Sequence, residues 1–235
     1  MWVATAAQMK QVERQAAELG MPYRQMMEQA GMAAAAYLMR CQPVAGKRTV
    51  IFAGKGNNGG DGFVCARLLC QAGAQVAVVL VDGAPGTGDA AAMYRRLDSL
   101  PVEWIKPEAA ARSDIFIDAI YGTGFHGQLP PAAMRAAAVM NGGRGRVYAL
   151  DMPSGVCADT GAAADGAVQA AHTVAFDSLK PAHLSLPGRA LCGQVACADI
   201  GIPEICHNGT GCVAAAEEEV HFAVQVSYTD MEVWR

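Results

Sequence analysis

The sequence predicts an α/β protein, a parallel sheet with helices on both faces that follows two N-terminal helices. Three observations lead to this prediction. Short apolar runs alternate with helical stretches from residue 48 onward, a glycine-rich segment follows the first of these runs, and 52% of the 235 residues are hydrophobic while 17% are charged. A chain of this length and composition has ample apolar material for one large core. We therefore expect residues 1–235 to form a single domain.

The first two elements are predicted as helices over residues 5–19 and 23–41, separated by the break Gly20-Met21-Pro22. Met26, Met27 and Ala30 recur at helical spacing in the second helix, and we interpret this stripe as core packing. Glu28 lies among these apolar positions. We consider it a candidate to face a functional site.

The remaining chain alternates between strand and helix patterns. We predict strands at 48–53, 75–82, 114–119, 146–151, 173–176 and 220–226, with helices at 60–72, 88–98 and 130–141. The last of these helices starts with proline, a residue that suits the first helical position. Such alternation places ligands at the carboxyl ends of the parallel strands.

The glycine-rich segment Gly54 to Gly62 follows the first predicted strand directly. Gly54, Gly56 and Gly59 satisfy the dinucleotide-binding spacing G-x-G-x-x-G, although glycines after strands also occur for geometric reasons alone. The nearby Asn57-Asn58 pair and Asp61 supply amides and a carboxylate, which suit a site that also holds a cation or orients polar groups. We expect this segment to be a loop that binds a nucleotide.

Three polar clusters follow later strands of the predicted sheet. Asp118 precedes a second glycine-containing segment, Asp151 and Ser154 leave another strand together, and Lys180 stands before Pro181. Because parallel strands end at one edge of the sheet, we expect these side chains to meet Asn58 and Asp61 in one crevice.

Charge and cysteine content restrict the function classes. The net charge of −4 and the absence of a basic stripe argue against a nucleic-acid partner. The eight cysteines form no C-x-x-C pair, so we expect most to be reduced, and Cys206-His207 with Cys212 makes only a weak zinc pattern. The N-terminus does not read as a signal peptide and no apolar run is long enough to cross a membrane. We expect a cytoplasmic protein without a membrane partner.

Five motifs in order resemble the YjeF N-terminal domain family, whose enzymes are NAD(P)HX epimerases. The resemblance runs from about Met9 to Ile202. The five motifs are Met26-Met27-Glu28-Gln29-Ala30-Gly31, Gly56-Asn57-Asn58-Gly59-Gly60-Asp61-Gly62, Asp118 with Gly122-Thr123-Gly124, Asp151-Met152-Pro153-Ser154-Gly155, and Lys180-Pro181. The chain departs from the family mildly at Ala182, where glycine is expected, and at Glu13, where aspartate is more frequent.

The resemblance implies a Rossmann-like three-layer α/β/α sandwich and an isomerase that interconverts the R and S forms of hydrated NADH and NADPH. An ADP- or ATP-dependent dehydratase would then restore the S form. The resemblance also implies a homodimer. A dehydratase domain is not expected within these 235 residues, so the chain is either a standalone epimerase or one domain of a bifunctional enzyme.

The resemblance also implies site residues. Those expected to contact the hydrated dinucleotide are Asn57, Asn58, Gly59, Gly60, Asp61, Gly122, Thr123, Gly124, Phe125, His126, Gly127, Gln128 and Asp151. A potassium ion is implied at Asn58, Asp118 and Ser154, whose hard oxygen atoms suit such a cation.

For catalysis, our hypothesis is that a carboxylate removes the hydroxyl proton at the epimeric carbon, so that the ring opens to an aldehyde and recloses on the other face. Asp118 is the candidate general base, and Asp61 and Lys180 are the candidate proton donors. Two other functions stay open. An NAD-dependent oxidoreductase would use Asp82 near the ribose, and a binding module of this fold would need none of the site acids.

Overall fold

A computed structural model describes residues 1–215 and the backbone of residues 223–227. Its main sheet has eight strands among the described residues, and every neighbouring pair is parallel. The strands in order across the sheet are β11 (Ala223–Ser227), β9 (Gln194–Asp199), β7 (His172–Phe176), β6 (Arg146–Leu150), β5 (Ile115–Ala119), β2 (Arg48–Ala53), β3 (Gln75–Leu80) and β4 (Glu103–Trp104).

The central strands are apolar throughout because helices cover both of their faces. In β2 the four residues Val50 to Ala53 are all fully buried, as are Phe116 and Ile117 in β5. A continuous run of this kind is typical of a parallel strand, whereas a strand with one wet face alternates apolar and polar residues.

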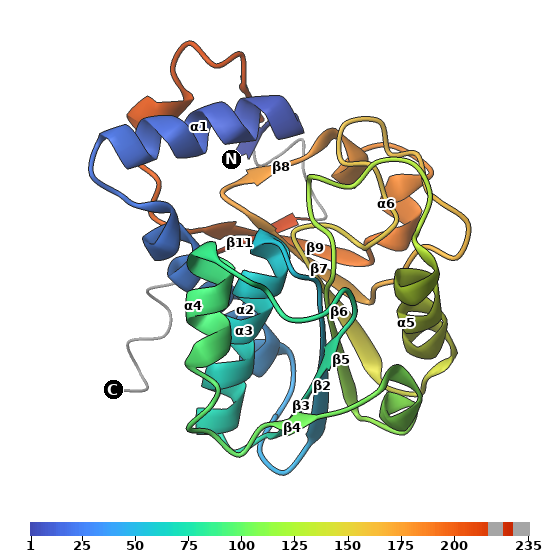
Figure 1. The fold of residues 1–235 in the computed structure, drawn as a ribbon. Coiled ribbons are helices and arrows are strands. Elements are labelled where there is room, and N and C mark those ends of the chain that lie inside the picture. Colours follow the sequence, from blue (N-terminus) through green and yellow to red (C-terminus); the bar gives the residue numbers. More distant parts are fainter. Residues whose placement is uncertain (216–222, 228–235) are drawn as a thin grey trace.

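Helices form a layer on each side of the sheet (Figure 1). α2, α3 and α4 lie on one side and α5 and α6 on the other, while α1 crosses above the carboxyl ends of the strands. The helices are α1 (Ala6–Glu18), α2 (Tyr23–Cys41), α3 (Asn57–Gln71), α4 (Gly88–Arg95), α5 (Pro131–Gly142) and α6 (Gly188–Leu191), with short 3₁₀ helices η1 (Pro107–Ala110), η2 (Pro181–His183) and η3 (Glu204–His207).

A small second sheet fixes the start of α1. It consists of β10 (Val213–Ala214), β1 (Trp2–Val3) and β8 (Ser178–Leu179), so the N-terminus pairs with the segment that leads to Lys180. Thr5 then caps α1 by accepting a hydrogen bond from the Gln8 amide, while the Gln8 side chain accepts one from the Thr5 amide in return. The Ala6 amide donates to Asp159 Oδ1 at 2.7 Å.

The strand order places a topological switch point between β2 and β5. The chain moves from β2 outward through β3 to β4, then crosses back to β5 on the other side of β2 and continues toward β11. The connections that leave β2 and β5 therefore diverge to opposite faces and open a crevice at their carboxyl ends. This crevice is where the predicted polar clusters were expected to meet.

The predicted fold class is confirmed, and the predicted elements lie within a few residues of those observed. One prediction was wrong: the segment from Asn57 to Gly62 is the first part of α3 and not a loop. Helix is accessible there because Gly59, Gly60 and Gly62 allow α3 to pack directly against its neighbours. The small sheet and β9 were missed, since Val195 is the only β-branched residue among the six of β9 and such residues mark a strand.

Three further expectations from the sequence concern the cysteines, membrane-spanning segments and the last predicted strand. All eight cysteines are free thiols. Within residues 1–215, no helix combines the length and the apolarity that crossing a membrane requires. Of the strand predicted at 220–226, only residues from Ala223 onward are described, as part of β11, and residues 220–222 lie outside the described part of the chain.

Candidate functional site

A cavity of about 440 Å³ lies at the carboxyl ends of the strands and is lined on one side by α1. Its lining comes from α1, from the start of α3, from the carboxyl end of β7, and from the segments that follow β2, β3, β5, β6, β8 and β9. The polar residues that line it are Lys10, Glu13, Lys55, Asn57, Asn58, Asp61, Asp82, Tyr121, Thr123, Asp151 and Lys180, and the apolar ones include Met9, Ile120, Phe125, Phe176 and Ile200.

An ion pair lies at the base of this cavity. Lys180 Nζ is 2.7 Å from Asp151 Oδ1 and donates to the carbonyl oxygens of Phe176 at 3.0 Å and Ser178 at 2.9 Å. The lysine side chain is 1% exposed. Burial by itself would lower the pKa of Lys180, but the Asp151 carboxylate outweighs burial and the net pKa is raised. The ammonium therefore keeps its charge, held by two carbonyl hydrogen bonds and by the ion pair with Asp151.

Asp151 adopts a backbone conformation that few residues accept. Its φ is 63°, in the left-handed region, which aspartate tolerates better than most residues. The carboxylate is fixed at its second oxygen, since the Thr123 amide donates to Asp151 Oδ2 at 2.8 Å. Gly122 permits this approach because a Cβ there would lie 2.6 Å from the same oxygen. The sequence Gly122-Thr123 thus serves to orient Asp151.

Two further acids in the cavity hold their protons more tightly than usual. Burial raises the pKa of Glu13 to about 7, although the Lys180 charge opposes this shift. Burial also raises the pKa of Asp61 well above its ordinary value, and the Asp151 and Glu13 carboxylates add to the effect. The cavity therefore combines Asp151, which is paired with Lys180, with two acids whose pKa values are raised.

Asp118 lies behind the cavity wall and not in its lining. It is fully buried, accepts hydrogen bonds from the Ser154 amide at 2.7 Å and the Ser154 hydroxyl at 2.6 Å, and also accepts one from the Ile120 amide. Burial raises the pKa of Asp118 to about 6 even though these hydrogen bonds lower it. Among the described residues, no ion pair involves Asp118.

The set Asn58, Asp118 and Ser154 fits a hard cation by its chemistry. The Asn58 side chain is buried at the start of α3, and both its Oδ1 and its Nδ2 are without a hydrogen-bond partner. A buried amide oxygen without a hydrogen-bond partner and a buried carboxylate without a basic partner are both groups that a cation would satisfy. Carboxylate, amide and hydroxyl oxygens suit potassium as well as other hard ions.

The first turn of α3 supplies a second polar feature. Its N-cap residue Gly56 offers no side-chain cap, so the first amides of the helix have no capping partner. Asn57, Asn58 and the exposed Lys55 line the cavity at this point, and Lys10 lines it from α1. Free amides at the start of a 15-residue helix together with two lysines favour an anionic group such as a phosphate.

The structure brings some predicted residues together and separates others. The predicted residues that line the cavity are Asn57, Asn58, Asp61, Gly122, Thr123, Gly124, Phe125, Asp151 and Lys180. Those that do not line it are Gly59, Gly60, Asp118, His126, Gly127, Gln128 and Ser154. His126, Gly127 and Gln128 are exposed beyond the cavity rim, while Gly59 and Gly60 are buried in helix packing.

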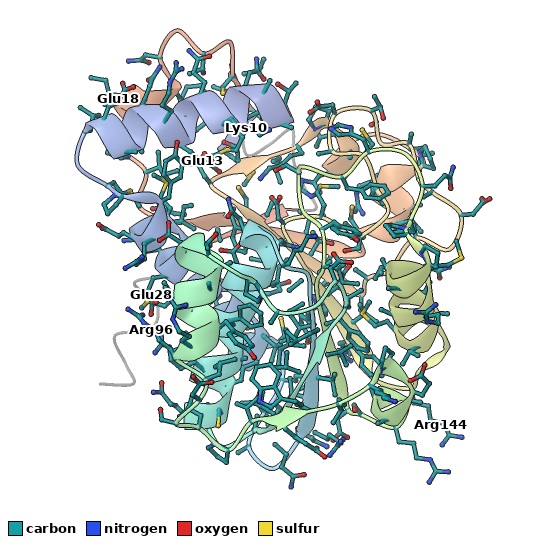
Figure 2. All side chains as sticks on the ribbon, in the orientation of Figure 1. Lys10, Glu13, Glu18, Glu28, Arg96 and Arg144 are labelled. Carbon is teal, nitrogen blue, oxygen red and sulfur yellow. The ribbon has the colours of Figure 1, made fainter. Side chains whose placement is uncertain are left out.

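Glu28 does not face the cavity. It pairs with Arg67 and, at 2.8 Å, with Arg96, on the outer side of α2 and α4 (Figure 2). Conversely, Glu13 was not predicted as a site residue, although its position carried a signal. It lies on the stripe of α1 between the buried Met9 and Ala16, and an acid at such a position is a candidate for a buried polar site.

Comparison with known proteins decides the family. The family described as YjeF-related protein N-terminus matches residues 23–182. This chain belongs to that family. It is 40% identical over 200 residues to the NAD(P)H-hydrate epimerase of Pirellula staleyi, a match that covers 80% of this chain and 86% of the relative. It is 37% identical to the bifunctional NAD(P)H-hydrate repair enzyme Nnr of Moorella thermoacetica, covering 87% of this chain but only 41% of that relative.

A solved structure has a similar architecture. The yeast protein ynu0, YNL200c, has a TM-score of 0.72 to this chain at 23% identity, with 90% of this chain and 94% of the yeast chain covered. Similarity at this level of identity supports the α/β fold described above.

Proposed function

We propose that this protein of the YjeF N-terminal family is an NAD(P)H-hydrate epimerase that interconverts the R and S forms of hydrated NADH and NADPH. The observation that carries the proposal is the buried Asp151–Lys180 pair, which faces two proton-holding acids in one cavity. Epimerases of this name in Pirellula staleyi and Cenarchaeum symbiosum align over 86% and 96% of their own lengths.

In the proposed mechanism the general base is Asp151 and not Asp118, because of these two residues only Asp151 lines the cavity. The Asp151 carboxylate takes the proton of the hydroxyl group on the epimeric carbon. The bond from this carbon to the ring nitrogen then breaks, the carbon becomes an aldehyde, and the nitrogen receives a proton from Asp61 or Glu13. Reclosure on the opposite face of the aldehyde returns both protons and inverts the carbon.

Lys180 has a different role in this proposal. Its ammonium is held by the carbonyl oxygens of Phe176 and Ser178 and by the Asp151 carboxylate, and its pKa is raised, so it is a poor proton donor. Instead, its fixed charge holds the Asp151 carboxylate in place and stabilises the negative charge that develops on the substrate oxygen. Of Asp61 and Lys180, the two residues that the sequence indicated as proton donors, Asp61 is the better candidate.

The remaining parts of the proposal concern ligands and partners. Asn58, Asp118 and Ser154 would hold a potassium ion, which supplies positive charge behind the cavity wall and orders the segments that carry these residues. The start of α3, with Lys55 and Lys10, would bind the diphosphate. We further propose that the protein is a cytoplasmic homodimer of single-domain chains. In this proposal it acts together with an ADP- or ATP-dependent dehydratase. Bifunctional relatives carry both repair activities in one chain by their names.

An oxidoreductase is the rival activity. It would need Asp82 to bind a ribose, yet Asp82 Oδ1 already accepts a hydrogen bond from the Tyr121 hydroxyl at 3.2 Å. The acids around Lys180 would also have no evident role in hydride transfer. The proposed epimerase uses the acids around Lys180 and does not require Asp82 to bind a ribose.

The test is a coupled assay. Purified protein is incubated with R-NADHX, an S-specific dehydratase and ATP, and the formation of NADH is followed by its absorbance. The expected result is conversion of the R form faster than its spontaneous epimerisation, lost in Asp151→Asn and retained in Glu28→Gln, which changes an ion pair outside the cavity. No acceleration by the folded wild-type protein would reject the epimerase and favour a binding module.

A further inference from the structure

His183 lies completely buried behind the Asp151–Lys180 pair. It is the last residue of η2, is 0% exposed, and does not line the cavity. Its Nδ1 lies 3.0 Å from the main-chain nitrogen of Lys180, and its Nε2 lies 3.0 Å from the main-chain oxygen of Asp151. One imidazole ring therefore connects the backbones of both residues of the ion pair.

The two partners fix the state of the ring. The Lys180 amide can only donate, so Nδ1 must be an acceptor, and the Asp151 carbonyl can only accept, so Nε2 must carry the hydrogen. Only the neutral Nε2–H tautomer meets both requirements. The pKa of His183 is lowered to about 4, first by burial and then by the Lys180 charge, which is consistent with a neutral ring at physiological pH.

The bridge acts on a backbone that needs support. Asp151 has a φ of 63°, and a residue other than glycine persists there only when its surroundings hold it. Three contacts do so around the peptide: the Asp151 amide donates to Val174 at 2.7 Å, Thr123 holds the side chain, and His183 holds the carbonyl. Of these, only the His183 contact also fixes Lys180.

We propose that His183 is a positioning residue, whose neutral ring sets the placement of the Asp151 carboxylate against the Lys180 ammonium. This inference rests on the proposed epimerase activity for its kinetic consequence, but not for its structural one. His183 touches neither the cavity nor a substrate within it. Its effect passes through the two residues that do line the cavity.

Three variants separate the two hydrogen bonds. His183→Gln can keep a donor to the Asp151 carbonyl, His183→Asn can keep an acceptor for the Lys180 amide, and His183→Leu keeps neither. Misplacement of a reacting group by about 1 Å can cost up to about a hundredfold in rate, so we expect kcat to fall at least about tenfold in His183→Leu and less in the two amide variants. KM is expected to change little, since the binding surface is intact.

A second readout does not require activity. The pKa of Lys180 is measured by NMR of a protein labelled at the lysine side chains. The titratable groups of Asp151, Asp177 and Cys197 face this ammonium and act on its pKa. We expect this pKa to fall in His183→Leu, because a looser Asp151 contact supports the ammonium less. His172→Gln is the control: His172 is also buried, bonded to Tyr37 at the amino end of β7, and should leave both kcat and the pKa of Lys180 unchanged.

The outcomes are distinct. Wild-type kcat and an unchanged pKa of Lys180 in folded His183→Leu would overturn the proposal, and so would a change confined to KM. If His183→Leu does not fold, the same two measurements on the Gln and Asn variants decide the matter. If the wild-type protein proves inactive, the proposed function fails, whereas the pKa of Lys180 still tests the positioning role.

Discussion

Lys180 keeps its charge although burial alone would lower its pKa, because Asp151 and two backbone carbonyls surround its ammonium group. At the residue scale the same partners define Asp151, whose other carboxylate oxygen accepts the Thr123 amide. Breaking such a buried pair leaves an uncompensated charge, which is more costly than removing both members. The pair therefore acts as one unit in function and in stability.

Neutralising either member of this pair should abolish epimerisation. For Asp151→Asn and Lys180→Met we expect kcat/KM to fall by about 10²-fold or more, since general acid–base groups contribute on that scale. Initial rates with R-NADHX measure the effect. The double variant should lose little more than either single variant, and purely additive losses would contradict the unit.

Glu13 should make stability depend on pH. Its folded pKa of about 7 lies above its ordinary 4.5, so the folded state binds the proton more tightly and its contribution to stability is lost as pH rises from about 4.5 through 7. We expect Glu13→Gln to be more stable than the wild type at pH 8 by roughly 1–3 kcal/mol, and nearly equal to it at pH 5. Urea unfolding at both pH values measures this. A difference independent of pH would show that Glu13 is not buried in the way described.

At the element scale, the start of α3 depends on close packing against the end of β2. A Cβ at Gly59 would lie 1.9 Å from the Gly54 carbonyl oxygen. The backbone would have to move to relieve this steric clash. Nothing lies within 4 Å of a Cβ at Gly56, whose φ of −91° suits any residue. The two glycines share a motif, but only one is required by packing.

This contrast gives a matched pair of variants. Gly59→Ala should destabilise the protein by about 2–4 kcal/mol or prevent folding, as overpacking and backbone strain do, whereas Gly56→Ala should change stability by less than about 1 kcal/mol. Thermal unfolding followed by circular dichroism provides the measurement. Similar melting temperatures for the two variants would be inconsistent with this packing.

At the scale of the whole molecule, the proposed cation site joins three segments at the topological switch point. Asn58 comes from α3, Asp118 from β5, and Ser154 from the segment after β6. Ionisation of the buried Asp118 costs stability as pH rises from its ordinary 3.8 through about 6. A cation bound beside this carboxylate would offset that cost and fasten the segments together.

Potassium should therefore raise the melting temperature, and more at pH 8 than at pH 5. We expect an increase of a few °C in potassium chloride relative to tetramethylammonium chloride at equal ionic strength, because binding to the folded state alone stabilises it. Asp118→Asn and Asn58→Ala should lose the increase. Asp82→Asn, which alters the cavity but not this set, should keep it, and an increase that survives in Asp118→Asn would reject the site.

Much of this architecture could be predicted from the sequence because local patterns determine it. The apolar run Val50 to Ala53 can only be a buried strand in this context, and the alternation that follows requires a parallel sheet whose strands end on one edge. That edge was enough to predict that Asn58, Asp61, Asp151 and Lys180 lie near one another. Periodicity also placed the helices to within a few residues, since capping and helix breaks are local.

Only the tertiary structure decided which of these residues face the cavity. Asp118 and Asp151 both end strands of the sheet, yet hydrogen bonds from Ser154 and Ile120 hold the first behind the wall, while Gly122 and Thr123 turn the second toward the cavity. Glu13 lines the cavity and His183 lies behind it because of the placement of α1 and η2, which depends on contacts between segments far apart in the sequence. Burial sets the charge state of each of these groups, and burial is a property of the packed molecule that no local pattern contains.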